Sequence, residues 1–160
     1  MKFLRELIPY IIVIVVVVFI RTFIVTPVKV NGTSMYPTLD GGEIMLLNKL
    51  GKIDRYDIVV LKIDAENDNL IKRIIGLPGE TVEIKDNKVY INDKKFEDSF
   101  GYGITYNIDK VTLGDDEYFV LGDNRIVSLD SRVFGKIKKK DIKGTTNFII
   151  YPFKKIGKVK

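Results

Sequence analysis

The segment Val82-Glu83-Ile84-Lys85-Asp86-Asn87-Lys88-Val89-Tyr90-Ile91 carries the clearest fold signal in this chain. Apolar and polar residues alternate on both sides of Asp86-Asn87, and a period of two is typical of a β-strand with one buried face. Asp and Asn tolerate the left-handed backbone conformation that a tight turn requires. The segment therefore predicts a β-hairpin.

Short apolar runs of similar length lie on either side of this hairpin, separated by turn-forming residues. No amphipathic helix of about ten residues or more is indicated after Pro27. Short helical turns are expected at 37–40 and 128–131. The predicted fold is mainly β, with one β-rich domain over residues 26–160. Further strands are predicted at residues 28–30, 44–47, 58–63, 70–75, 118–121 and 148–151, the last ended by Pro152.

The segment Ile8 to Val25 does not fit this pattern, because it is almost entirely apolar. As a helix, 18 residues would span about 27 Å, close to the roughly 30 Å of a bilayer core. Pro9 falls in the expected first turn, where a missing N–H costs little. A buried core helix is disfavoured because residues 13–18 are apolar on every face. We therefore predict a transmembrane anchor at 8–25, after a short segment at 1–7.

Two features of this anchor leave alternatives open. A cleaved signal peptide is the rival interpretation, although the apolar core is long and no A-x-A-like site follows it. The flanking charges nearly balance, because Lys2 and Arg5 precede the span and Arg21 and Lys29 follow it. The charge count alone therefore does not set the direction of insertion.

The composition removes several kinds of chemistry. The 160 residues contain no cysteine, which excludes disulfides, thiol catalysis and cysteine-based metal sites. They contain no histidine, which excludes a Ser-His-Asp triad and histidine-ligated zinc. The net charge of +5 suits an anionic membrane surface or nucleic acid without choosing between them.

The segment Asn31-Gly32-Thr33-Ser34-Met35-Tyr36-Pro37-Thr38-Leu39 places a serine in a loop shortly after the anchor. Small residues precede Ser34 and Pro37 restricts the backbone beyond it, so the hydroxyl is accessible to an approaching chain. The alternative is a strand-to-turn connection whose hydroxyls satisfy local backbone groups. If Ser34 is a nucleophile, its base is not a histidine.

The segment Leu70-Ile71-Lys72-Arg73-Ile74-Ile75 is an apolar strand that carries two cations. Lys72 and Arg73 lie on opposite faces, each beside apolar neighbours, so at least one is expected to point into a buried place. The alternative is an edge strand whose cations reach solvent along their stems. Burial makes a neutral lysine amine available as a base, whereas guanidinium stays charged. Lys72 is therefore the candidate base for Ser34, and Arg73 is expected to be structural.

The segment Gly122-Asp123-Asn124-Arg125-Ile126-Val127-Ser128-Leu129-Asp130-Ser131-Arg132 is dense in turn formers and opposite charges. Two Asp–Arg pairs would brace a long loop through bidentate hydrogen bonds. An ordinary salt-bridged surface turn has the same composition and is the alternative. A metal site using Asp123 and Asp130 is disfavoured, because their spacing lacks the pattern of a calcium loop.

Together, these clusters resemble those of bacterial type I signal peptidases, also called leader peptidases. Their order and the membrane segment ahead of them also match, over nearly the whole chain except its ends and residues 92–116. The matching blocks are N-G-T-S-M-Y-P-T-L at 31–39, Y-D-I-V-V-L-K at 56–62, I-K-R-I-I-G-L-P-G-E at 71–80, and G-D-N-R-I-V-S-L-D-S-R-V-F-G at 122–135.

The resemblance implies a serine endopeptidase that removes signal peptides from exported proteins. Ser34 matches the nucleophile, and Lys72 matches the general base. Ser128 matches the serine that orients the lysine amine. The residues that match further supporting positions are Asp123, Asp130 and Arg132.

The resemblance also implies an oxyanion hole to which the main-chain N–H of Ser34 contributes. In some members a hydroxyl residue two places before the nucleophile supplies a second donor. That place is Gly32 here, as in the shorter, single-anchor members typical of Gram-positive bacteria, so no side-chain donor is available there. By similarity, an extended substrate would lie between two segments of the chain. The residues expected to bind it are Val28, Val30, Asn31, Asn69 and Ile71.

The family's fold is a β-rich catalytic domain lying against the membrane. The resemblance implies a single-pass protein of the cell membrane, with residues 1–7 in the cytoplasm and residues 26–160 outside it. The implied partners are secretory preproteins and membrane lipid. No nucleic acid, metal or cofactor is implied.

Two other functions remain open at this point. One is a self-cleaving Ser/Lys protease related to the repressors of the DNA-damage response, which carry DNA-binding domains where this chain has a membrane segment. The other is a non-catalytic, membrane-tethered β module that binds lipid head groups through its Lys-rich end. The second requires neither Ser34 nor Lys72.

Overall fold

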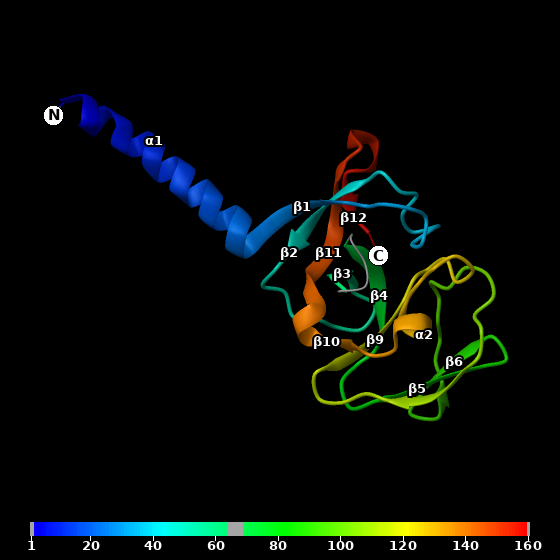
Figure 1. Ribbon diagram of the computed structural model, residues 1–160. Helices are drawn as coiled ribbons and strands as arrows, with labels where there is room; N and C mark the ends of the chain where they lie inside the picture. The colour runs from blue at the N-terminus through cyan, green and yellow to red at the C-terminus, as the bar shows by residue number, and fades with distance from the viewer. Residues whose placement is uncertain (1, 64–68, 160) are drawn as a thin grey trace.

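The computed structural model describes residues 2–63 and 69–159. The chain begins with a long helix, α1 (Lys2–Phe19), which continues as a π-helical turn, η1 (Ile20–Ile24), and passes directly into strand β1 (Val25–Lys29). Figure 1 shows α1 projecting away from the β-rich body. The stretch Glu6–Ile24 is long and apolar enough to cross a membrane, and its side chains are not buried by the rest of the protein.

The start of α1 differs from the expectation for Pro9. Because α1 begins at Lys2, Pro9 lies inside the helix and not in its first turn. Val25, the last residue of the predicted span, is already paired as the first residue of β1. Strand pairing with the body therefore begins as soon as the helical segment ends.

The larger sheet has eight strands, and every strand pairing in it is antiparallel. Its order is β1-β2-β11-β3-β4-β9-β10, with β12 added beside β11. β4 lies between β3 and β9 in this order, although β9 pairs only with its second half, from Arg73 onward. The alternative in which the two cations reach solvent from an edge strand is wrong, because Lys72 and Arg73 are both buried. The strands that follow β1 are β2 (Ile44–Asn48), β3 (Ile58–Leu61), β4 (Leu70–Gly76), β9 (Glu117–Leu121), β10 (Ile137–Lys138), β11 (Ile142–Tyr151) and β12 (Gly157–Lys158).

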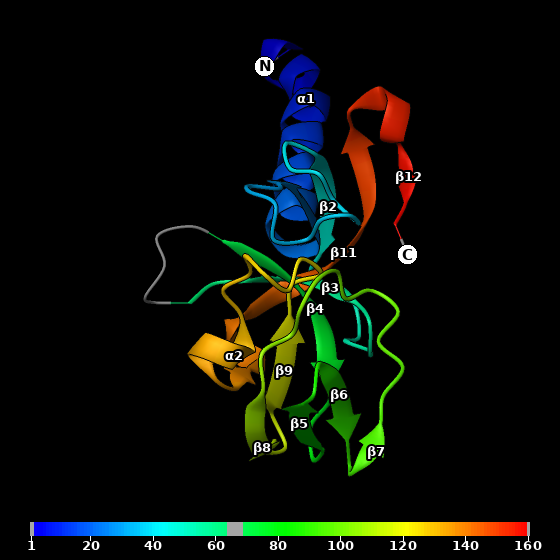
Figure 2. The same cartoon turned by 90° about the vertical axis from the view of Figure 1, so that its right-hand side faces the viewer.

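A second, four-stranded sheet has the order β7-β6-β5-β8. Figures 1 and 2 show its strands at the end of the body that lies away from α1. The predicted hairpin is confirmed, because β5 and β6 pair in antiparallel register around Asp86 and Asn87, both of which have positive φ. The strands are β5 (Thr81–Lys85), β6 (Lys88–Ile91), β7 (Lys94–Lys95) and β8 (Ile108–Thr112).

The mainly β prediction is confirmed, with differences in the extent of the strands. β8 was not predicted, and β11 begins at Ile142 and not at residue 148. β7, β10 and β12 have only two residues each, too few for a periodic pattern. β3 ends at Leu61 and not at residue 63. The expected turn at 128–131 becomes a short helix, α2 (Ser131–Phe134). The turn expected at 37–40 lies slightly earlier, at residues 34–38, where the backbone N–H of Leu39 donates to the Met35 carbonyl at 2.9 Å. Two 3-10 turns complete the structure, η2 (Lys139–Asp141) and η3 (Phe153–Lys155).

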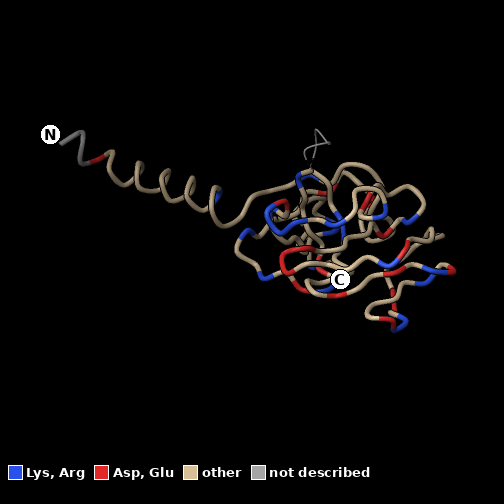
Figure 3. Tube along the Cα trace, turned by 60° about the horizontal axis from the view of Figure 1, so that its bottom comes forward, with Lys and Arg blue, Asp and Glu red and all other residues tan. Residues whose placement is uncertain are grey.

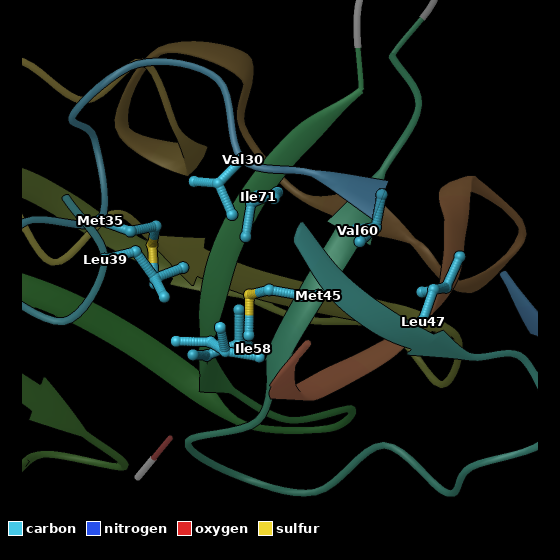
Figure 4. Packing of buried hydrophobic residues seen from close by; sticks show 9 residues of the cluster. Val30, Met35, Leu39, Met45, Leu47, Ile58, Val60 and Ile71 are labelled. Atoms are coloured by element: carbon cyan, nitrogen blue, oxygen red, sulfur yellow. The ribbon is translucent and has the colours of Figure 1, made fainter. Parts of the chain in front are cut away.

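One hydrophobic cluster joins the larger sheet to the loop that follows β1. Met35 and Leu39 from this loop are each 1% exposed, and Figure 4 shows them pointing toward the strand residues of the cluster. Burying such side chains stabilises a fold by about 1.5–3 kcal/mol each. The loop is therefore held by two apolar contacts on either side of Pro37. The other buried members are Val30, Met45, Leu47, Ile58, Val60, Ile71 and Ile149.

Candidate active site

Ser34 lies in the loop between β1 and β2, where backbone contacts hold it in place. Its carbonyl accepts a hydrogen bond from the backbone N–H of Asn124 at 3.0 Å, and the Asn124 side-chain amide donates to the Thr33 carbonyl at 3.3 Å. The adjacent Met35 is buried in the core, whereas Ser34 itself is partly exposed. The loop is therefore anchored from both sides while the serine stays accessible.

Lys72 reaches this serine from the middle of the larger sheet. Its Nζ donates to Ser34 Oγ at 2.9 Å and to the Ile71 carbonyl at 3.1 Å. The side chain comes from β4 and is only 2% exposed. The expectation that at least one of the two cations is buried is confirmed, and Arg73 is buried as well, at 1% exposure.

A pocket of about 270 Å³ opens where the two side chains meet. It gives an external chain access to Ser34 Oγ, while the other side of Lys72 is enclosed by the sheet. Val127 and Leu129, both about half exposed, form an apolar rim on one side. The residues that line the pocket are Asn31, Gly32, Thr33, Ser34, Leu70, Lys72, Val127 and Leu129.

Asp123 connects three segments of the site through its buried carboxylate. It accepts hydrogen bonds from Arg73 Nε at 2.8 Å and Nη2 at 2.7 Å, and a third from Thr38 Oγ1 at 2.5 Å. Arg73 also donates to the Tyr56 carbonyl at 2.9 Å, and its guanidinium lies 3.6 Å from the centroid of the Phe100 ring. The alternative of an ordinary salt-bridged surface turn is therefore wrong at Asp123. Asp123 pairs with the strand cation and is fully buried.

Asp130 and Arg132 form the second ion pair, within the loop itself. Arg132 Nε and Nη2 each donate to Asp130 at 2.8 Å, which is a bidentate arrangement. Asp130 also accepts from the backbone N–H of Gly122 at 3.0 Å, and Arg132 donates to the Ser128 carbonyl at 3.2 Å. The pair therefore fixes the two ends of the loop that carries Ser128.

Ser128 lies beside the dyad without sharing a hydrogen bond with it. It is 8% exposed, and its Oγ has no hydrogen-bond partner among the residues that the structure describes. A Cβ at Gly122 would lie 2.2 Å from Ser128 Oγ and 2.5 Å from the Ser34 carbonyl oxygen. Only glycine at 122 thus allows Ser128 to pack this close to the Ser34 backbone.

The residues expected beside a substrate lie on two strands with free edges. β1 is the terminal strand of its sheet, and residues 70–72 of β4 pair with β3 on one side only, within the described part of the chain. Asn31 and Asn69 are exposed and Val28 is partly exposed. The side chains of Val30 and Ile71 are buried in the core, so these two residues offer an approaching chain their backbone.

Gly32 has a positive φ of 75° and borders the pocket. A Cβ there would meet no atom within 4 Å, so its conformation and not crowding favours glycine. Gly32 supplies no side-chain donor, and its backbone lies two residues before Ser34. At position 32 the main-chain N–H is therefore the one available donor.

Two polar residues that sequence reasoning did not single out hold the site together. Thr38 binds Asp123 and so connects the nucleophile loop to the 122–132 loop. Arg125 is 2% exposed, pairs with Asp98, and donates to the Gly122 carbonyl at 3.0 Å. Their adjacency to Ser34 and Ser128 in the motifs was the available signal. Among the residues that the structure describes, no group of three or more acidic side chains is placed to hold a metal ion.

Comparisons with known proteins agree on one family. The model of the family described as "Signal peptidase, peptidase S26" matches residues 4–151. A signal peptidase I of Bacillus amyloliquefaciens is 42% identical over 94% of this chain and 89% of its own length. One from Streptococcus pneumoniae is 33% identical over 98% of this chain and 97% of its own length.

A solved structure shares the fold. The crystal structure of a signal peptidase I from Enterococcus faecalis superposes with a TM-score of 0.54 at 32% sequence identity. The superposed region covers 59% of this chain and 97% of the Enterococcus faecalis chain. The likeness in structure is therefore accompanied by likeness in sequence.

Proposed function

The chain belongs to the signal peptidase family, peptidase S26, and we propose that Ser34 is its nucleophile and Lys72 its general base. Members of this family are membrane-anchored serine endopeptidases, and this chain cleaves the signal peptides of secretory preproteins. The observation that carries this proposal is the 2.9 Å hydrogen bond between Lys72 Nζ and Ser34 Oγ at the floor of an open pocket. This distance is within the reach that proton transfer requires.

The buried position of Lys72 supports its role as a base. Removing an ammonium group from water disfavours its charged form, so burial favours the neutral amine. Two buried carboxylates of the site, Asp123 and Asp130, pair with Arg73 and Arg132, which balance their negative charge. In this proposal the two ion pairs hold the loops in place around the dyad.

The reaction proceeds through an acyl-enzyme. The neutral Lys72 amine takes the proton of Ser34 Oγ as this oxygen attacks the carbonyl carbon of the scissile peptide bond. The resulting lysinium donates that proton to the leaving amine as the carbon–nitrogen bond breaks. Water then loses a proton to Lys72 and attacks the carbonyl carbon of the ester. The lysinium returns that proton to Ser34 Oγ as the ester bond breaks, which releases the signal peptide with a new C-terminal carboxyl group and restores Ser34 and the neutral amine. The main-chain N–H of Ser34 would stabilise the oxyanion.

The supporting residues have separate positioning roles in this proposal. Asp123 holds the nucleophile loop against β4 through Thr38 and Arg73. Asp130 and Arg132 hold Ser128 next to the dyad, where its hydroxyl would orient the lysine amine in the substrate complex. The free edges of β1 and β4 would bind the substrate as an added strand, through Val28, Asn31 and Asn69 and the backbone of Val30 and Ile71.

The orientation in the membrane is also a proposal. Residues 1–7 would lie in the cytoplasm, residues 8–25 would form a single-pass span, and residues 26–160 would form the catalytic domain outside, close to membrane lipid. The similarity to signal peptidases supports this direction, because the charges that flank the span nearly balance. Long domains cross a membrane largely regardless of their charge, so Lys29 is no obstacle. The apolar stretch Glu6–Ile24 supports the position of the span.

The function of the dyad is tested by identifying the bond that is cut. The full chain in detergent is incubated with a purified preprotein, and the new N-terminus is sequenced. Cleavage at the end of the signal peptide by the wild-type chain, and its loss in Ser34→Ala, is the expected result. Cleavage by the Ser34→Ala protein at the wild-type rate would refute the role of Ser34.

A further inference from the structure

The anchor and the catalytic body meet without a linker. η1 ends at Ile24, and the next residue, Val25, is already paired with Asn48 of β2. The backbone N–H of Val25 donates to the carbonyl of Ile20, so this residue belongs to both the helix end and the sheet. The direction of the anchor is thus coupled to the direction of β1.

The body supplies hydrogen-bond donors to the last turn of the anchor. Lys49 Nζ donates to the carbonyls of Thr22 at 2.8 Å and Arg21 at 3.2 Å. The backbone N–H of Lys49 donates to the Ile24 carbonyl at 2.9 Å, and Thr26 Oγ1 donates to the Arg21 carbonyl at 2.6 Å. Carbonyls at a helix end lack partners within the helix, and a cation there interacts favourably with the helix dipole.

These contacts lie at the point where the apolar segment ends. Figure 3 shows the anchor as a nearly uncharged helix whose charged positions are at its two ends, and Arg21 is in the last turn. Close to hydrocarbon, a carbonyl without a donor is costly because little water is available to replace the bond. Lys49 is partly buried, and its ammonium donates to two of these carbonyls. These contacts favour one position of the side chain over free movement.

We propose that Lys49 is a positioning residue that fixes the angle between the anchor and the catalytic body, and so fixes the depth of Ser34 relative to the membrane. This inference rests on the proposed role of Ser34. Ser34 lies nine positions after Val25, and residues 25–29 form β1, a paired and therefore stiff strand. Tilting the anchor against β1 would move Ser34 toward or away from the bilayer.

The depth of Ser34 matters because the substrate is held in the same bilayer. The apolar segment of a signal peptide sets the height of its cleavage site, which changes by about 3.3 Å for each extended residue inserted between them. A fixed anchor angle therefore selects preproteins in which this spacing brings the scissile bond to Ser34. A loosened angle accepts a wider range of spacings at a lower rate for the preferred one.

Lys49→Met tests this proposal, because it keeps the length of the side chain and removes the donor. The full chain is reconstituted in vesicles and given inserted preproteins whose cleavage site is shifted by one to four residues. The same variant in detergent is given a short soluble peptide that spans the cleavage site. Lys52→Met is the matched control, since Lys52 is an exposed neighbour that pairs with Asp54 on the surface. Lys49→Arg keeps a cationic donor.

The expected results differ between the two substrates. Misplacing reacting groups by about 1 Å can cost up to a hundredfold in rate, so kcat on the inserted preprotein should fall by roughly tenfold to a hundredfold. The profile against spacing should broaden, and kcat/KM on the soluble peptide should stay within about twofold of wild type. Lys49→Arg should restore most of the loss, and Lys52→Met should show none.

Three outcomes would overturn the inference. Equal losses on both substrates would show damage to the active site, and an unchanged spacing profile would show that the contact does not position the anchor. A loss seen in vesicles with anionic lipid but not in zwitterionic vesicles would assign Lys49 to lipid phosphate binding. An unchanged spacing profile or a lipid-dependent loss would not by itself contradict the proposed role of Ser34. That role would still be supported if the wild-type chain cleaves the preprotein and the Ser34→Ala chain does not.

Discussion

Lys72 Nζ lies 2.9 Å from Ser34 Oγ, although the two residues are 38 positions apart in the sequence. One comes from a loop with a partly exposed serine, and the other from an internal strand with a buried lysine. The contact therefore joins a group that a substrate can reach to a group that water reaches poorly. Substitutions at Ser34 and at Lys72 should therefore have different effects on stability.

Ser34→Ala should abolish cleavage while leaving the protein folded. A loop hydroxyl contributes on the order of 1 kcal/mol to stability, whereas loss of a nucleophile costs several orders of magnitude in kcat. Initial rates on a preprotein and the thermal midpoint of unfolding measure the two effects. Ser99→Ala, at an exposed serine outside the pocket, should retain both activity and stability. Cleavage by Ser34→Ala at more than about one per cent of the wild-type rate would contradict the assignment.

Lys72→Arg should be nearly inactive although it keeps the positive charge, because a guanidinium does not release its proton at working pH. Lys72→Met should be equally inactive and at least as stable, since a buried charge is then no longer required. Activity assays and urea unfolding separate these effects. Lys62→Arg, at an exposed lysine just after β3, is the control and should behave like wild type. A folded Lys72→Arg protein with near wild-type activity would exclude Lys72 as the base.

Asp123→Asn should destabilise the protein strongly. It removes the carboxylate charge that pairs with the buried Arg73 guanidinium, and breaking a buried pair costs about 3–5 kcal/mol of unfolding free energy. Urea denaturation should show this as a lower midpoint with a similar slope. Asp54→Asn, which breaks the exposed pair with Lys52, should leave the midpoint almost unchanged. Equal midpoints for the two variants would mean that the buried pair is not important for stability.

Lys155→Met should destabilise the protein in a pH-dependent way. Burial would raise the pKa of Glu43, but hydrogen bonds from Lys155 and from backbone N–H groups outweigh it and hold this pKa below its ordinary value of 4.5. Hydrogen bonds to Asp40 and Glu43 raise the pKa of Lys155 above 10.5. The carboxylate's contribution is present above pH 4.5 and is lost as pH falls through the lowered pKa. The lysine's contribution is present below pH 10.5 and is lost as pH rises through the raised pKa.

The difference in thermal midpoint between wild type and Lys155→Met should therefore be largest between these limits and shrink below pH 4.5. Lys154→Met, at the adjacent exposed lysine, should show a small and constant difference over the same range. A Lys155→Met difference that stays constant from pH 7 down to pH 3 would contradict the linkage.

The proposed orientation predicts which side of the membrane each end occupies. Because the chain has no cysteine, a single Asp115→Cys reports the location of an exposed turn between β8 and β9. An impermeant thiol reagent should label it in intact spheroplasts. Lys2→Cys should react only after the membrane is disrupted. The reverse pattern would place the catalytic body in the cytoplasm.

The sequence by itself determined the elements whose pattern is local. The hairpin around Asp86 and Asn87, most of the longer strands and the apolar anchor were all predictable, because strand alternation and continuous apolarity depend on neighbouring residues only. The burial of a cation at residues 72–73 was predictable for the same reason, since both faces of that strand are apolar. The start of the helix was not, because α1 includes polar residues before the apolar run and tolerates Pro9 in its interior.

Only the tertiary structure decided which distant groups meet. Asp123 has two arginines within ten residues in its own segment, yet it pairs with Arg73, because the sheet places β4 beside β9 and the loop that follows it. The contacts of Thr38 with Asp123 and of Lys49 with the anchor are likewise absent from any local pattern. A side chain's partner depends on how separate segments pack, and spacing along one segment does not encode that arrangement.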